Sequence, residues 1–235
     1  YLAAGTYEMY TRDELAFQKK HAFASLIRNG ITTALPIASL FYRAWGETVQ
    51  EFEDAAEAAA ALGLRAYLGP AYRTGNQLVE ADGRITTHYD EARGLAELDA
   101  AIDFAKRHEG AAGGLIRAMF APDRIEPSTA ELLRRTAAVS RELDIPVRLH
   151  CCQSKIEYDL VLAQHGMSPP EWLESLGFLD NRCLLPHGTV VSGSRLIDRP
   201  GRDLEIIRDS GASIVHCPLV SGRHGNAIDH FGRYR

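Results

Sequence analysis

Three histidines in the second half of the chain each follow a short apolar run. They are His150 in VRLHCC (147–152), His187 in RCLLPHG (182–188) and His216 in ASIVHCP (212–218). Runs of this length are consistent with buried strands, and histidine is the commonest metal ligand in proteins. If the three strands are parallel, their carboxyl ends meet at one edge, where the imidazoles can share a metal ion. A core histidine with only a structural role is the alternative for each residue taken singly.

Four other reactive or polar side chains stand at expected strand ends. Asp123 follows the apolar run 115–122, and Gln153 follows the adjacent pair Cys151 and Cys152. Asp123 could contact a substrate or cap a turn, and the sequence leaves both readings open. A cysteine nucleophile paired with His187 is a further alternative, but the sequence offers no carboxylate to orient the histidine. The two cysteines should point to opposite sides if the strand continues through them.

The segments that must position these residues alternate between helix and strand. Helical periodicity covers 13–29, with Asp13 as the expected N-cap and Gly30 at the C′ position. Ser128 and Glu131 read as a capping box that opens a later helix. The expected helices are 13–29, 47–62, 90–108, 128–143, a stretch after 153 that breaks at Pro169-Pro170, and 201–210; the expected strands are 31–36, 64–69, 115–122, 147–152, 182–188 and 212–218. Segment 70–89 reads as an irregular loop.

Six strands, each preceded by a helix, predict an α/β fold with a parallel sheet. A doubly wound sheet and a (β/α)₈ barrel both satisfy this pattern. No GxGxxG motif follows the first expected strand, and the sequence has no GxxxxGK(S/T) motif. The sequence therefore does not indicate a phosphate-binding loop for a nucleotide.

Composition excludes several other classes. The chain has 235 residues and a formal net charge of −5, which gives no electrostatic reason to expect nucleic acid or a membrane as partner. It has no apolar run near 18 residues and no signal-peptide pattern at its start. Four cysteines without a CxxC pair suggest reduced thiols, so we expect a cytoplasmic protein. A homo-oligomer is compatible with the sequence.

Several blocks resemble one family in both order and spacing. NGITTALP (29–36), IPVRLHCCQS (145–154), SPPEWLESLGFLDNRCLLPHGTVV (168–191) and GASIVHCPLVSGRHG (211–225) are similar to the strand-two, strand-five, strand-six and strand-seven blocks of the amidohydrolase superfamily. The resemblance is to the branch of cytosine and guanine deaminases and triazine chlorohydrolases. It implies a distorted (β/α)₈ (TIM) barrel, with strands two to seven present in this chain as a single domain over 1–235.

The resemblance also implies roles for individual residues. His150 matches a metal ligand, His187 matches a residue that binds metal or holds the attacking water, and His216 lines the substrate pocket. The implied cofactor is one divalent metal, zinc first and iron as the alternative. Such a metal activates water for attack on a C–N bond of a small heterocyclic substrate, with deamination as the expected reaction.

Two departures from the family pattern matter. The strand-one His-x-His pair and the strand-eight Asp have no counterpart here, so we expect a barrel that is incomplete at both ends. Gln153 stands where the family has a proton-shuttling glutamate, and an amide cannot transfer a proton at neutral pH. Glu157 is a weak substitute if the segment after Gln153 is helical. The alternative function is a barrel with a degenerate site that binds a small molecule without turnover.

The remaining candidates carry weaker signals. Trp45, Tyr72 and Tyr89 could stack a flat ring, although aromatic packing is the commoner role. His224 and His230 lie in a polar tail segment and read as solvated residues rather than ligands.

Overall fold

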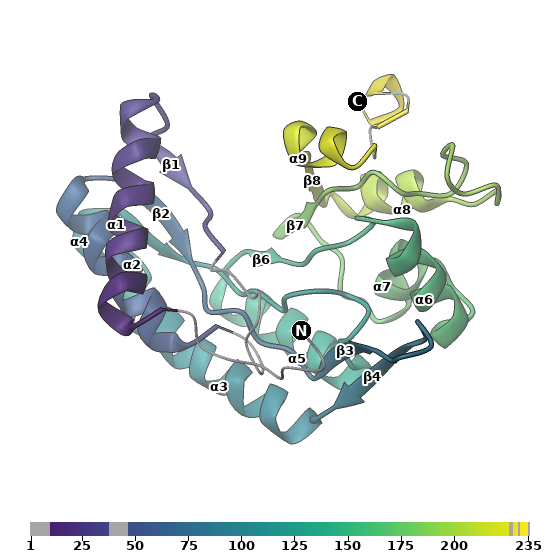
Figure 1. Cartoon of the computed structure of the whole chain (residues 1–235), viewed down its shortest axis with the longest axis horizontal. Coiled ribbons are helices and arrows are strands. Elements are labelled where there is room, and N and C mark those ends of the chain that lie inside the picture. The colour runs from purple at the N-terminus through teal and green to yellow at the C-terminus, as the bar shows by residue number, and fades with distance from the viewer. Residues whose placement is uncertain (1–9, 38–46, 226–227, 230, 235) are drawn as a thin grey trace. The chain divides into compact units, whose positions relative to one another are not determined.

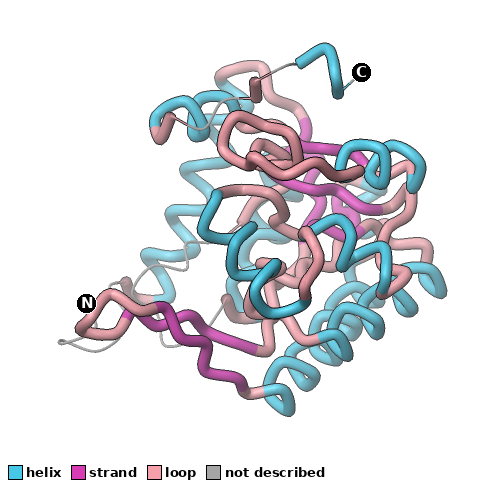
Figure 2. Tube along the Cα trace, turned by 90° about the vertical axis from the view of Figure 1, so that its right-hand side faces the viewer, coloured by secondary structure: helices cyan, strands magenta, loops and turns pink. Residues whose placement is uncertain are grey.

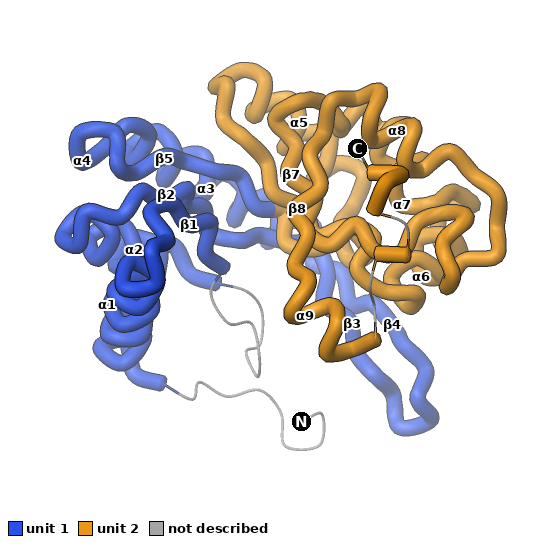
Figure 3. Tube along the Cα trace, turned by 90° about the horizontal axis from the view of Figure 1, so that it is seen from above, with its two compact units in different colours: residues 1–121 blue, residues 122–235 orange. Residues whose placement is uncertain are grey.

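The computed structural model describes residues 10–37, 47–225, 228–229 and 231–234. The chain divides into two compact units, residues 1–121 and 122–235 (Figure 3). Helices and strands alternate in both units, as expected for an α/β protein (Figures 1 and 2). None of the helices in the described ranges combines the length and apolar character needed to cross a membrane.

Unit 1 is built around three parallel strands in the order β1-β2-β5. Its elements are α1 (Arg12–Arg28), β1 (Thr33–Ala34), α2 (Val49–Leu62), β2 (Arg65–Leu68), β3 (Gly75–Val79), β4 (Ile85–Tyr89), α3 (Glu91–His108), α4 (Ala111–Gly114) and β5 (Ile116–Ala118). Phe52 of α2 and Phe104 of α3 meet edge to face within a core that includes Ala66 of β2. The Ala-rich sequence of α2 lets this helix pack closely, and Gly63 ends it in the left-handed conformation.

Unit 2 contains a second set of three parallel strands, in the order β6-β7-β8. Its elements are α5 (Ala130–Leu143), β6 (Val147–Arg148), α6 (Lys155–His165), α7 (Pro169–Ser175), β7 (Cys183–Pro186), α8 (Asp203–Ser210), β8 (Ser213–Val215), α9 (Pro218–Arg223) and the 3₁₀ helix η1 (Phe231–Tyr234). The expected parallel strands are therefore confirmed. In the described residues these strands do not close into a barrel.

Two expected helix starts are wrong. Thr11, not Asp13, is the N-cap of α1, because Thr11 and Glu14 form a reciprocal capping box. Thr129 caps α5, while the hydroxyl of Ser128 instead donates to the carbonyl of Arg124 at 2.7 Å. In both cases a second hydroxyl or carboxylate within two residues competes for the same role.

The expected irregular loop 70–89 is also wrong, because it contains the antiparallel hairpin β3–β4 (Figure 2). Its turn is stabilised by Asp82, which accepts from the backbone N–H of Arg84 at 2.9 Å, and by Gly83 at φ 85°. An Asp-Gly pair is a known hairpin signal. The strands are polar, as the sequence ITTHY of β4 shows, so they lack the hydrophobic alternation that would predict a strand.

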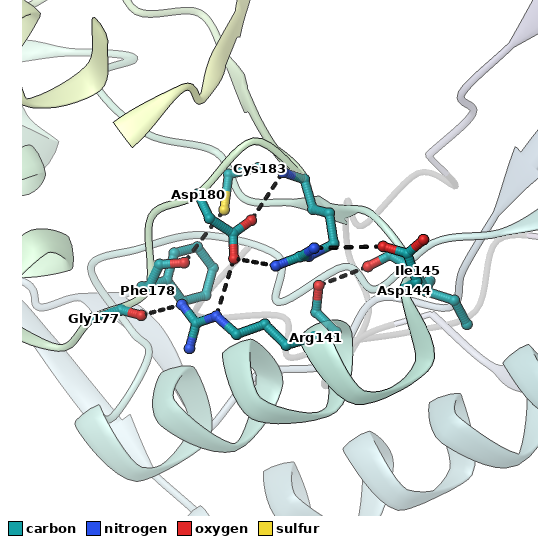
Figure 4. A network of polar contacts seen from close by, with 9 residues as sticks. Arg141, Asp144, Ile145, Gly177, Phe178, Asp180 and Cys183 are labelled. Atoms are coloured by element: carbon teal, nitrogen blue, oxygen red, sulfur yellow. Dashed lines mark hydrogen bonds and ion pairs between the residues drawn. The ribbon is translucent and has the colours of Figure 1, made fainter. Parts of the chain in front are cut away.

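A polar network anchors the start of β7 in unit 2 (Figure 4). Asp180 accepts from the backbone N–H of Arg182 at 2.9 Å and from its guanidinium at 2.8 Å. Arg141 of α5 donates to the same carboxylate at 3.1 Å, and it also contacts the carbonyl of Gly177. This network fixes one end of the strand whose other end leads to His187.

Candidate active site

Backbone pairing in unit 2 continues past the ends of the named strands and brings the candidate residues together. Arg124 and His150 form an isolated parallel bridge, as do Cys151 and His187. The N–H of His187 donates to the carbonyl of Val215, the residue before His216. Asp123, His150, His187 and His216 therefore stand on neighbouring chain segments at one edge, as the sequence predicted.

His150 and His187 face each other. Their ring centroids are 5.4 Å apart, and the ring planes make an angle of 28°. His187 is 8% exposed, and His150 is half-buried. A zinc–nitrogen bond is about 2.0–2.1 Å long, so this spacing is compatible with two imidazoles that share one ion.

The ring of His150 is oriented by the backbone. Its Nδ1 lies 2.7 Å from the carbonyl oxygen of Asp123. A carbonyl can only accept, so Nδ1 carries the proton and Nε2 is left with a free lone pair. This is the arrangement in which an outer acceptor fixes the tautomer of a metal-binding histidine.

Both histidines are held in the neutral form. Burial, together with the nearby His150 and Arg124, lowers the pKa of His187 to about 4. Burial also lowers the pKa of His150, although the hydrogen bond to Asp123 opposes this shift. Neutral imidazoles are the form that binds metal, so the pair is suited to ligation at neutral pH.

Asp123 acts in this arrangement through its main chain. Its side chain is 5% exposed, and its carbonyl also accepts from the backbone N–H of His150 at 3.1 Å. This role was not visible in the sequence, because a backbone contact leaves no trace in residue type. His216 is half-buried, and its Nδ1 is buried without a hydrogen-bond partner among the described residues.

Gln153 and Glu157 follow on the same segment. Gln153 Oε1 is buried and has no hydrogen-bond partner in the described part of the chain. Glu157 is 1% exposed, and its carboxylate accepts from the backbone N–H groups of Cys152 and of Gln153, the latter at 3.1 Å. The segment is helical, as the sequence argument for Glu157 required, but both carboxylate oxygens are occupied by the backbone. Burial and Glu126 raise the pKa of Glu157 to about 8, against the opposing effect of Arg124.

The cysteine pair does not support a nucleophile. Cys152 has φ 60°, so the strand does not continue through it, and the two sulfur atoms lie 3.6 Å apart rather than on opposite sides. The contact with Cys151 and burial raise the pKa of Cys152 well above 9. The same contact lowers the pKa of Cys151, but burial and the nearby acidic residues Glu157, Asp203 and Glu126 together outweigh it, so the pKa of Cys151 is raised. Both groups therefore remain thiols, which are weak nucleophiles.

The weaker candidates lie as follows. Tyr72 is fully buried at 1% exposure, whereas Tyr89 is 46% exposed on β4. His224 is exposed, which fits a solvated residue. Trp45 and His230 lie outside the described residues.

The donor set fits part of a metal site. His150 and His187 offer two neutral nitrogen ligands, the kind that zinc and iron accept. The described residues contain no group of three or more histidine, cysteine or acidic side chains placed to hold an ion. Within the described residues, the candidate ligands are therefore the pair His150 and His187.

Several known proteins are similar to this chain in sequence or in fold. The chain is 28% identical over 175 residues to the 5-methylthioadenosine/S-adenosylhomocysteine deaminase of Halobacterium salinarum, covering 74% of this chain and 36% of that protein. It is 28% identical over 221 residues to the 8-oxoguanine deaminase of Pseudomonas aeruginosa, covering 93% and 46%.

Among solved structures, a mutant of the atrazine chlorohydrolase of Arthrobacter aurescens, complexed with zinc and atraton, aligns with a TM-score of 0.76 at 20% identity, covering 96% of this chain and 47% of that one. The chain thus spans less than half the length of each of these proteins. The sequence model of the Amidohydrolase family matches residues 6–231. The chain therefore belongs to the amidohydrolase family.

Proposed function

We propose that this chain forms part of a metal-dependent hydrolase that deaminates a small heterocyclic substrate. The observation that carries the proposal is the facing pair His150 and His187, two neutral imidazoles with ring centroids 5.4 Å apart at neighbouring strand ends. The names of the relatives, which are deaminases of adenosine derivatives and of 8-oxoguanine, support the reaction class.

The two parallel sheets are proposed to be strands two to seven of one distorted (β/α)₈ barrel, within a single domain over residues 1–235. The structural likeness to the chlorohydrolase supports this, since it covers 96% of the chain. In such a barrel the active site lies at the carboxyl ends of the strands. His150, His187 and His216 all stand at such ends.

His150 is proposed as a metal ligand through Nε2, with Asp123 holding its ring from behind. His187 is proposed as the second ligand, or as the residue that orients water and substrate. Zinc is the favoured ion, as in the zinc-bound chlorohydrolase structure, and iron is the alternative. When bound, such an ion supplies an activated water for attack on a ring carbon.

The other residues bind and orient the substrate in this proposal. Gln153 and His216 each have a buried polar atom without a partner among the described residues, and a polar heterocycle would satisfy both. The Gln153 amide can hydrogen-bond but cannot carry a proton. Because the carboxylate of Glu157 faces the backbone, His187 is the residue that we propose for proton transfer among the described candidates.

The test is ammonia release by the zinc-loaded protein. Aminated purines, pterins, pyrimidines and triazines are supplied in turn, including 5-methylthioadenosine and 8-oxoguanine, and the His150→Asn variant serves as the inactive control. Turnover that is lost in the variant supports the proposal. Tight binding of a heterocycle without any turnover would instead favour the non-catalytic alternative.

A further inference from the structure

Glu157 is the third residue of α6, a position where glutamate usually hydrogen-bonds within its own helix end. In α6 the N-cap is Ser154, whose hydroxyl accepts from the backbone N–H of Glu157 at 3.2 Å. A glutamate at this third position normally reaches back to the N–H of the N-cap residue and completes a capping box. Glu171 does so in α7, where its carboxylate accepts from the N–H of Ser168 at 2.7 Å.

The carboxylate of Glu157 passes over its own N-cap and binds the preceding turn. One oxygen accepts from the N–H of Cys152 and the other from the N–H of Gln153. Cys152 is the second residue of the cysteine pair, and Gln153 directly precedes the N-cap Ser154. Of the two hydrogen bonds of a capping box, α6 therefore has only the one from the Glu157 N–H to the Ser154 hydroxyl. The Glu157 carboxylate instead binds residues before the helix.

The turn that Glu157 binds has an uncommon backbone conformation. Cys152 has φ 60°, the left-handed region that residues with side chains rarely adopt. Its carbonyl accepts from the N–H groups of Thr189 at 2.9 Å and Val190 at 3.0 Å. The hydroxyl of Thr189 reaches the carbonyls of Cys152 and Gln153 at 3.2 and 3.3 Å. The peptide between Cys152 and Gln153 is therefore held from both sides.

The next side chain along is that of Gln153, whose buried Oε1 has no hydrogen-bond partner in the described part of the chain. A buried acceptor of this kind is costly unless a ligand supplies a donor. The position of the Gln153 side chain depends on how firmly its backbone is held. Glu157 lies 1% exposed behind that backbone and cannot itself meet a substrate with either oxygen.

We propose that Glu157 is a positioning residue that fixes the backbone of Cys152 and Gln153, so that the Gln153 amide is preset to accept a hydrogen bond from an N–H group of the substrate. This proposal rests on the proposed function and specifies how the same site would bind its substrate. The favoured substrates carry an N–H donor, such as a ring lactam N–H or an exocyclic amine, on the edge that meets Gln153.

The test compares three variants of the zinc-loaded protein. Glu157→Gln keeps the size of the side chain but leaves only one acceptor atom for two N–H donors. It is compared with the wild type above the Glu157 pKa of about 8, where the wild-type side chain is a carboxylate. Glu171→Gln is the matched control, because it removes a glutamate from the same helix position where the contact is local. Thr189→Val removes the hydroxyl that holds the same peptide from the other side, and it keeps the proposal testable if Glu157→Gln does not fold.

Two readouts separate positioning from general damage. Hydrogen exchange at the amides of Cys152 and Gln153 reports the contact directly and does not depend on activity. Steady-state kinetics are measured with 5-methylthioadenosine or 8-oxoguanine, whichever the wild type turns over. In Glu157→Gln we expect faster exchange at both amides and a KM raised by about tenfold, the low end of the effect of losing an orienting partner. We expect kcat within about threefold of the wild type and unchanged zinc content, because the change acts on substrate binding rather than on the metal site.

Thr189→Val should change KM in the same direction by a smaller factor, and Glu171→Gln should change neither readout. Unchanged exchange in Glu157→Gln would overturn the proposal, and so would a fall in kcat that follows loss of zinc. If the wild type turns over no heterocycle, the proposed function fails. The exchange data alone then decide whether Glu157 holds this turn.

Discussion

The Nδ1 atom of His150 lies 2.7 Å from the carbonyl oxygen of Asp123. The segment after β5 thus sets the orientation of a ring that is carried by the segment after β6. The same carbonyl also accepts from the backbone N–H of His150 at 3.1 Å, so ring and backbone are held by one atom. Because this partner is backbone, no substitution of the Asp123 side chain can remove it directly.

Replacing His150 should abolish high-affinity zinc binding. His150→Asn keeps a polar group of moderate size, but it removes the Nε2 ligand that the Asp123 contact leaves free. We expect at least a 100-fold weaker zinc affinity, since loss of an outer partner alone costs about 10–100-fold. Isothermal titration calorimetry of the metal-free protein measures this. His224→Asn, which changes an exposed histidine, is the control. Equal zinc affinity in His150→Asn and the wild type would exclude His150 as a ligand.

The thiols should differ in reactivity according to burial. Cys151, Cys152 and Cys183 are buried, and Cys217 is partly exposed. Burial raises the pKa of Cys183 to about 11. We therefore expect iodoacetamide to label Cys217 first in the folded protein and the other three only in urea, as read by peptide mass spectrometry. Rapid labelling of Cys151 or Cys152 with loss of activity would instead support a cysteine nucleophile.

Much of the fold could be predicted because the helix and strand signals are local. Gly63 follows α2 at the expected stop, and β7 and β8 lie inside the expected apolar runs. The errors arose where two residues compete for one role, as with Thr11 and Asp13. They also arose where strands lack an apolar face, as in β3–β4.

The candidate site residues could be proposed from their types, but the contacts that support them could not. His150 and His187 could be proposed because histidine after an apolar run is unusual and because the blocks around them resemble a family. The carbonyl of Asp123 could not be proposed, since every residue has one. The double contact of Glu157 was equally hidden, because its position in the sequence predicts a local capping box.

The Asp180 network should contribute to stability without contributing to metal binding. Partial burial opposes ionisation, but hydrogen bonds from Arg182 and then Arg141 lower the pKa of Asp180, so it is a carboxylate that accepts from both (Figure 4). Asp180→Ala removes these contacts, and we expect the free energy of unfolding to fall by about 1–2 kcal/mol. Urea unfolding measures the change, with Asp209→Ala on the exposed end of α8 as the control at below about 0.5 kcal/mol. Zinc affinity should not change, and a large loss would show that the network also shapes the site.

Glu157 should make stability depend on pH in the neutral range. Burial and then Glu126 raise the pKa of its carboxyl group from the ordinary value of 4.5 to about 8 in the folded protein. Between these two values the folded protein holds a proton that the unfolded chain has released. Its contribution to stability is therefore fully present below about pH 4.5 and is lost as pH rises through about 8.

The amide of Glu157→Gln does not titrate, so the stability of the wild type relative to this variant should decline steadily from pH 5 to pH 8. Urea unfolding of both proteins at unit pH intervals measures the difference. A difference that grows with pH would mean that the N–H donors of Cys152 and Gln153, together with Arg124, outweigh burial and favour the carboxylate.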